Sequence, residues 1–207
     1  MRKLTFLSLL FGLVFSSCRK TPNFDELSSD FVVTTNRDKA ADFTEYKTYY
    51  IADTVANLGG TGDDSILTDA NAQTLVQTVK DNMNARGYTF VSKDQHPDLG
   101  LQIGIVKVTT TVYYPGWWDG YYGWYDPWYW GWYYPYYYPY STVYSYNTGT
   151  VILNMYDLKN AGTEHQITGI WNNIDFGAIG SSLSTNVQRG VNAINQGFAQ
   201  STYIKAN

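Results

Sequence analysis

Few residues of this 207-residue chain have the types and spacing that chemistry needs. The two imidazoles are His96, which precedes a proline, and His165, which stands at the start of an expected strand. A metal site needs several convergent imidazole, thiolate or carboxylate ligands, and neither histidine lies in such a motif. We therefore predict two surface histidines, with no bound metal and no cofactor.

A glycine-rich segment over residues 59–64 resembles a phosphate-binding loop only in its glycines. No Gly-Lys-Ser/Thr follows, and Asp63 and Asp64 would repel a phosphate at the entrance of the next helix. These two acids and Asp69 match no EF-hand spacing. We interpret them as helix-start acids that complement the helix dipole.

Serine and carboxylate chemistry are equally weak hypotheses. The segment from Gly180 to Ser184 lacks the second glycine of a nucleophile elbow, so Ser181 and Ser182 are expected to cap a helix. A pair of catalytic carboxylates stays open, but no acid stands in an apolar context that would desolvate it. We predict no catalytic residues and no enzymatic activity.

The first seventeen residues have the pattern of a lipoprotein signal peptide. Arg2 and Lys3 precede an apolar run that ends at Phe15, and two serines lead to Cys18, the one cysteine of the chain. The run is too short to span a bilayer comfortably. We predict a signal peptide over 1–17, lipidation of Cys18 and a lipidated tether over 18–29; an ordinary secretory signal and an uncleaved anchor are the alternatives.

The predicted location is the outer membrane of the cell envelope, with the domain facing the periplasm. The polar tether lacks the acidic cluster that marks surface export in some bacterial lipoproteins. The formal charge of −4 becomes −6 when Arg2 and Lys3 are removed, and this acidic balance argues against nucleic acid as a partner. Membrane contact would then come from the acyl chains.

Strand patterns and two helical patterns follow one another along the rest of the chain. Alternating or β-branched residues predict strands over residues 30–35, 46–51, 88–91, 99–112, 150–157 and 166–174. Apolar residues at helical spacing predict a helix over 65–86 and another from about 181 to 198. We predict one α+β domain over 30–207, an antiparallel sheet of about six strands covered by two helices, with the last two strands joined by a hairpin turn.

An aromatic insertion interrupts this pattern between the fourth and fifth strands. Residues 113–146 hold 20 tyrosines and tryptophans, four prolines and four glycines in 34 positions. Such a segment is either a low-complexity loop, a membrane-interface belt, or a platform that stacks on sugars or on a protein partner. The predicted contact residues are Trp117, Trp118, Trp124, Trp128, Trp130 and Trp132.

Several short motifs occur in an order that resembles a known family. They are Asp42-Phe43 followed by Tyr46-Lys47-Thr48-Tyr49, the helix end at Met83–Tyr88, Pro97-Asp98-Leu99, and Gly149–Leu153 followed by Asp157. Together with the signal sequence they resemble the bacterial lipoprotein family called domain of unknown function 4136, and we expect a source among the Bacteroidota. The resemblance implies fold and location and carries no activity or catalytic residue.

The sequence thus favours a lipid-anchored, non-enzymatic envelope protein with the aromatic segment as its contact surface. The second hypothesis is a glycan- or peptidoglycan-binding module, and the third is an envelope enzyme. The membrane, through the lipid anchor, and a glycan or envelope protein are the predicted partners.

Overall fold

A computed structural model describes residues 32–58, 60, 65–106, 110–112, 136–139, 144–146, 149–178 and 183–207. All of them belong to one compact unit, Phe31–Asn207. The signal peptide, Cys18, the tether and the six tryptophans of the insertion lie outside the described residues. Within the part of the chain that is described, no helix has the length and apolar character needed to cross a membrane.

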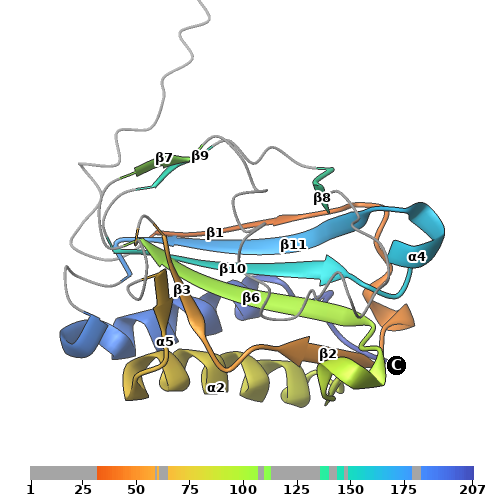
Figure 1. Cartoon of the computed structure of the whole chain (residues 1–207), viewed down its shortest axis with the longest axis horizontal. Coiled ribbons are helices and arrows are strands. Elements are labelled where there is room, and N and C mark those ends of the chain that lie inside the picture. Colours follow the sequence, from red (N-terminus) through yellow and green to blue (C-terminus); the bar gives the residue numbers. More distant parts are fainter. Residues whose placement is uncertain are drawn as a thin grey trace, which may run out of the picture. The chain divides into compact units, whose positions relative to one another are not determined.

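The described strands form a nine-stranded sheet and a separate pair (Figure 1). The main path runs in the order β1 (Val32–Arg37), β11 (Ile167–Phe176), β10 (Thr150–Asp157), β6 (Leu99–Val106), β2 (Thr48–Ile51) and β5 (Thr89–Phe90). Joined to this path are β3 (Val55–Leu58), β4 (Ile66–Leu67) and β8 (Tyr136–Tyr137). The separate pair is β7 (Thr110–Val112) with β9 (Tyr144–Tyr146).

The sheet is mixed, so the prediction of an antiparallel sheet of about six strands is wrong in direction and in size. β2 and β3 lie one after the other along the same edge of β6, and both run parallel to it. β5 is parallel to β2, and β8 is parallel to β11. The chain leaves the sheet after β4, crosses it as a helix and re-enters as β5 and β6, and such a crossover makes the returning strands parallel.

The other half of the sheet confirms the predicted hairpin pairing. β10 pairs antiparallel with β11 and, on its other side, with β6. A shift in register between Met155 and Tyr156 interrupts the β10–β11 ladder. Where a simple turn was predicted between these strands, the chain forms the short helix α4 (Ala161–Glu164).

Two long helices, α2 (Ala70–Ala85) and α5 (Leu183–Gln200), cover the same face of the sheet (Figure 1). α2 starts later than predicted, because residues 66–67 pair with β3 as β4. Asp69 caps it by accepting hydrogen bonds from the amides of Asn71 (3.0 Å) and Ala72 (2.8 Å). The helix-start role predicted for Asp69 is confirmed. Gly87 follows the helix with φ +88°, a conformation that glycine adopts without strain.

The predicted apolar stripes of both helices form the core between helices and sheet. Leu75, Val79 and Met83 of α2 are fully buried, as are Ile194 and Phe198 of α5. Val187 and Val191 pack against this core from its edge, while the side chain of Leu183 lies outside the described residues. Trp171 is buried on the same face, with its ring 5.1 Å from that of Phe198 and its Nε1 donating to Ser201 Oγ at 2.9 Å.

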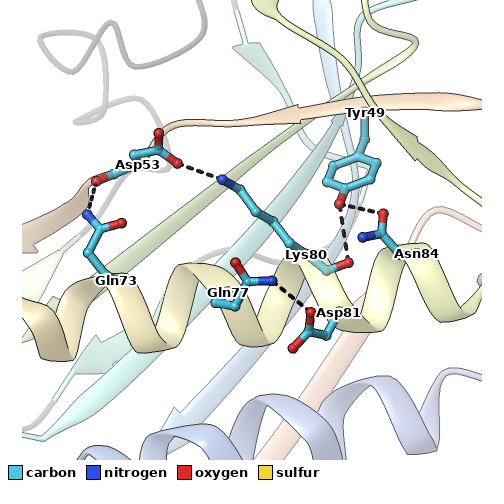
Figure 2. Close-up of polar contacts among 7 residues, drawn as sticks. All are labelled: Tyr49, Asp53, Gln73, Gln77, Lys80, Asp81 and Asn84. Atoms are coloured by element: carbon cyan, nitrogen blue, oxygen red, sulfur yellow. Dashed lines mark hydrogen bonds and ion pairs between the residues drawn. The ribbon is translucent and has the colours of Figure 1, made fainter.

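Polar side chains also fasten α2 to the strand β2 and the turn that follows it (Figure 2). The Tyr49 hydroxyl donates to the carbonyl of Lys80 at 3.2 Å and to Asn84 Oδ1 at 3.0 Å. Lys80 Nζ pairs with Asp53 Oδ1 at 2.6 Å, and Gln73 Nε2 donates to the carbonyl of Asp53. These contacts fix the position of β2, which begins two residues after Tyr46 of the pocket described below.

The described end of the aromatic insertion contacts the domain. The rings of Tyr136 and Tyr156 are 5.5 Å apart, and the hydroxyls of Tyr138 and Tyr156 are 3.0 Å apart. Tyr156 is fully buried in a small apolar cluster with Leu158, Ala161 and Ile167. Residues 136–138 of the insertion therefore pack against the folded domain. β8 continues the edge of β11 beyond the end of β1.

Candidate functional site

A pocket of about 370 Å³ opens where β1 ends and β11 begins. The segment after β1, the end of β10, α4, the start of β11 and Tyr137 of β8 form its wall. We call it the corner pocket. Its wall carries five carboxylates, those of Asp38, Asp42, Glu45, Asp157 and Glu164.

The floor of the corner pocket is a hydrogen-bonded group around Asp157, which is 6% exposed. The Tyr46 hydroxyl donates to Asp157 Oδ2 at 2.9 Å. Asn160 donates from its amide to Oδ1 at 3.0 Å and from Nδ2 to Oδ2 at 2.6 Å. Burial raises the pKa of Tyr46 well above its ordinary value, and the charge and hydrogen bond of Asp157 raise it further. Tyr46 therefore stays protonated and holds the carboxylate in place.

Asp98 ties the strand β2 to the end of β10 beside this floor. Its Oδ2 accepts from the amides of Lys47 (2.7 Å) and Thr48 (3.0 Å), and its own amide donates to Thr48 Oγ1 at 2.9 Å. Its carbonyl accepts from the amides of Leu158 and Lys159. Five hydrogen bonds thus converge on one residue and close the corner.

The segment between β1 and β2 forms one side of the rim. Asp42 caps the short 3₁₀ helix Phe43–Glu45, accepting from Thr44 Oγ1 at 2.7 Å and from the Thr44 amide at 3.0 Å. These two bonds lower the pKa of the Asp42 carboxyl, and the bond from the Thr44 hydroxyl has the larger effect. The Tyr88 hydroxyl donates to the carbonyl of Phe43 at 2.9 Å, and the Phe43 ring is buried in the core. These two contacts hold the segment against the domain.

Another part of the rim comes from α4 and the start of β11. Glu164 Oε2 accepts from Thr168 Oγ1 at 3.3 Å and from Gln166 Nε2 at 3.5 Å. Such long contacts are weak and leave the exposed Glu164 carboxylate able to turn toward a ligand. Tyr137, which also lines the pocket, is 50% exposed.

Among the described residues that line the corner pocket there is no lysine, arginine or histidine. The ion pair of Lys80 with Asp53 lies away from the pocket. The neighbouring cation, Lys159, donates its Nζ to the carbonyl of Glu45 at 2.8 Å. Described His, Cys, Asp and Glu side chains form no group of three that could hold a metal ion. The pocket is therefore a carboxylate-rich cavity, suited to polar and electrostatic binding.

A second polar group lies buried between β11 and α5. Asn173 Nδ2 donates to Asp175 Oδ2 at 2.9 Å, and both residues are fully buried. Asn173 Oδ1 and Asp175 Oδ1 have no hydrogen-bond partner in the described part of the chain. Burial raises the pKa of Asp175 well above its usual range, although the Asn173 bond acts in the opposite direction. Asn173 packs directly on Gly197, where a Cβ would lie 2.3 Å from its carboxamide carbon.

The structure places the two histidines as predicted, on the surface and apart from the pocket lining. His96 follows the 3₁₀ helix Lys93–Gln95, and His165 follows α4, each with φ 52°. Asp63, Asp64, Ser181 and Ser182 lie outside the described residues, as do Cys18 and the tryptophans from Trp117 to Trp132.

Sequence analysis missed the corner pocket. The family motifs named Asp42, Tyr46, Asp98 and Asp157, and these residues meet at the corner although they are far apart in the chain. The available signal was that all four belong to the motifs that carry the family resemblance. The rim acid Glu164 stands in no motif, so nothing in the sequence pointed to it.

Comparison with known proteins gives a family and a related fold. A family model described as a domain of unknown function, DUF4136, matches residues 33–201. A DUF4136 family protein from Bacteroides thetaiotaomicron is 32% identical, with a TM-score of 0.68 over 85% of this chain and 98% of that one. A PelC dodecamer from Paraburkholderia phytofirmans matches at 9% identity and a TM-score of 0.37, covering 86% of this chain and 99% of its own. A PelC variant from the same organism matches at 11% and 0.35, covering 79% and 95%. No curated protein matches the sequence.

Proposed function

This chain belongs to the DUF4136 family, and we propose that it is a lipid-anchored, non-enzymatic protein of the cell envelope that binds a ligand in the corner pocket. One observation carries the binding role. The innermost polar groups of the pocket, on Tyr46, Asp157 and Asn160, are bonded to one another, while carboxylates at the rim remain exposed. Such a site offers contacts to a ligand without an activated nucleophile or a free general base.

The lipid anchor is supported by the sequence pattern that ends at Cys18. We expect signal cleavage before Cys18 and acyl chains on that residue, holding the domain at the outer membrane on its periplasmic side. Mass spectrometry of the mature amino terminus tests this, with Cys18→Ser as the control. An unmodified Cys18, or cleavage at another bond, contradicts the anchor.

Binding in the corner pocket is tested by NMR on the uniformly ¹⁵N-labelled domain, residues 30–207. We expect soluble peptidoglycan fragments or other envelope glycans to shift the amide signals of residues 157–168. The same titration with the Glu45→Gln variant should give smaller shifts. Shifts confined to residues away from the pocket would refute its role as the binding site.

A second candidate function, a glycan- or peptidoglycan-binding module, is favoured by Tyr137. Its ring is half exposed at the rim, beside the carboxylates and the Gln166 amide. Aromatic rings next to carboxylates and amides are suited to stacking on a sugar ring and bonding its hydroxyls. Loss of glycan-induced shifts in Tyr137→Ala, with the fold retained, would support this candidate.

The tryptophans of the insertion remain proposed as a further contact surface. They are Trp117, Trp118, Trp124, Trp128, Trp130 and Trp132. Quencher access to these residues should fall when phospholipid vesicles or glycan fragments are added. Trp171 is the internal comparison, since it is buried and its signal should not change. Equal access with and without every partner would contradict this contact role.

A further inference from the structure

The corner pocket concentrates negative charge that the described chain does not neutralise. Five carboxylates line a cavity of about 370 Å³, and none of them has a described cation within 4.0 Å. Like charges that converge in one cavity repel each other, and the repulsion is greatest where the wall excludes water. A positively charged ligand would relieve this repulsion, whereas an anionic one would add to it.

The wall is more than a group of surface acids. Asp157 and Thr168 are more than nine-tenths buried and form its inner surface, and the Tyr46 hydroxyl is fixed against Asp157. The volume falls at the small end of the range for ligand cavities. A small organic ligand therefore fits, and a macromolecule would insert no more than one side group.

The spacing of the carboxylates selects the kind of cation. A divalent metal ion needs several ligand oxygens at about 2.0 to 2.6 Å from one point, and the described acids form no such group. Carboxylates that come from separate elements of a cavity wall instead suit an ammonium group on an organic frame. The exposed Tyr137 ring at the rim adds a face that attracts organic cations.

Two basic side chains near the pocket, those of Arg37 and Lys159, make contacts that are not ion pairs. Arg37 lies over the Tyr203 ring, 4.3 Å from its centroid. Lys159 donates to the Glu45 carbonyl and lies 5.9 Å from the Tyr46 ring. Neither lines the cavity. No described basic side chain forms an ion pair with the five carboxylates, so a cation that pairs with them would have to come from a ligand.

From this arrangement we infer that the corner pocket binds a ligand with a primary ammonium group, held between Glu45 and Glu164 and covered by Tyr137. The inference rests on the proposed binding role of the pocket and specifies the ligand class. Glu45 and Glu164 are exposed carboxylates from separate elements of the wall, and neither side chain makes a strong structural hydrogen bond. Asp157 contributes charge from the floor without leaving its own hydrogen bonds.

The test compares 1,5-diaminopentane with pentane-1,5-diol, which have similar size and differ in charge. Titration calorimetry and NMR on residues 30–207 should show binding of the diamine at the pocket, weakening as salt is raised, and no binding of the diol. Glu45→Gln and Glu164→Gln should each weaken binding by about two- to fivefold, in line with exposed charge pairs. Asp81→Asn, an exposed acid of α2 outside the pocket lining, is the matched control and should leave binding unchanged.

Four results would overturn the inference. The first is binding of the diol as strongly as the diamine, which would retain the pocket as a binding site but remove its preference for cations. The second is diamine binding that the Glu45→Gln and Glu164→Gln variants do not change. The third is tight binding of calcium chloride in competition with the diamine, which would assign the carboxylates to a metal ion. Absence of diamine binding, with glycan fragments still shifting residues 157–168, would likewise refute the ligand class and leave the proposed function standing.

Discussion

Asp175 lies beneath α5 without access to water, and its replacement by asparagine gives a quantitative test of the buried polar group. Its Oδ2 accepts from Asn173 Nδ2, while Asp175 Oδ1 and Asn173 Oδ1 lack described partners. Two oxygens that only accept cannot bond each other. A proton on Asp175 Oδ1 turns that atom into a donor, and an asparagine at this position would supply an N–H in the same place. The variant Asp175→Asn thus mimics the protonated acid.

The sign of the pH effect follows from the two states of the chain. In the unfolded chain Asp175 releases its proton at about pH 3.9, whereas burial raises its pKa in the folded chain. Between these two pKa values the folded protein holds more protons than the unfolded one. The stability that Asp175 contributes is therefore complete below about pH 4 and declines as the pH rises toward the folded-state pKa.

The expected slope is set by one proton. The free energy of unfolding of the unmodified protein should fall, relative to Asp175→Asn, by at most about 1.4 kcal/mol for each pH unit in that window. The difference should become constant once the pH exceeds the folded-state pKa. The residues opposite Asp175 on the neighbouring strands are Val33 and Val151, so no charge across the ladder offsets the effect.

Urea denaturation of both proteins at half-unit steps from about pH 4 to about pH 9 measures this difference. Asp81→Asn is the control because its side chain is exposed, and its difference from the unmodified protein should vary much less with pH. A difference for Asp175→Asn that does not change with pH would refute the argument. So would a variant that becomes less stable, relative to the unmodified protein, as the pH rises.

Three further predictions concern the scaffold. Asp98→Ala should lower the free energy of unfolding by about 1 to 3 kcal/mol, since the Lys47 and Thr48 amides lose their acceptor, and hydrogen exchange at these amides should speed up. Gly197→Ala should lower the free energy of unfolding by about 1 to 3 kcal/mol in the same urea assay, because the new Cβ would lie 2.3 Å from the buried Asn173 carboxamide. Gly162 is exposed and has open space at the Cβ position, so Gly162→Ala is the control and should change stability little. Ile194→Ala should cost about 2 to 5 kcal/mol by opening a cavity under α5, and Val191→Ala should cost less because Val191 is only partly buried; equal losses would contradict the packing described here.

Local patterns were enough to predict some elements and not others. The periodic spacing of Leu75, Val79 and Met83 located α2, and the same principle located α5. The pairing of β10 with β11 was predictable because a short connection joins them. In contrast, β3 has only four residues, which is too short to show a periodic pattern, and it was missed.

Strand direction depended on contacts between distant parts of the chain. β2 and β5 are separated by α2, and their parallel pairing follows from that crossover rather than from their residues. The two-residue strands β4 and β5 are too short to give a periodic signal. Asp69 was predictable as a helix-start acid because the signal for a helix start is local in the sequence, whereas β4 just before it gives no such signal.

The corner shows why the family motifs predicted the scaffold without predicting a site. Tyr46 and Asp157 are 111 positions apart, and Thr48 and Asp98 are 50 apart, yet each pair is joined by a hydrogen bond of 2.9 or 3.0 Å. The polar atoms that these motifs supply are thus largely used within the protein. Ligand contact then falls to groups such as Glu164 and Tyr137, which no motif includes and which the scaffold only positions. We therefore expect that replacing Glu164 or Tyr137 by another residue changes which ligand binds and leaves the free energy of unfolding nearly unchanged. Tyr46→Phe should instead lower the free energy of unfolding by about 1 to 3 kcal/mol, because it leaves the buried Asp157 carboxylate with one donor fewer.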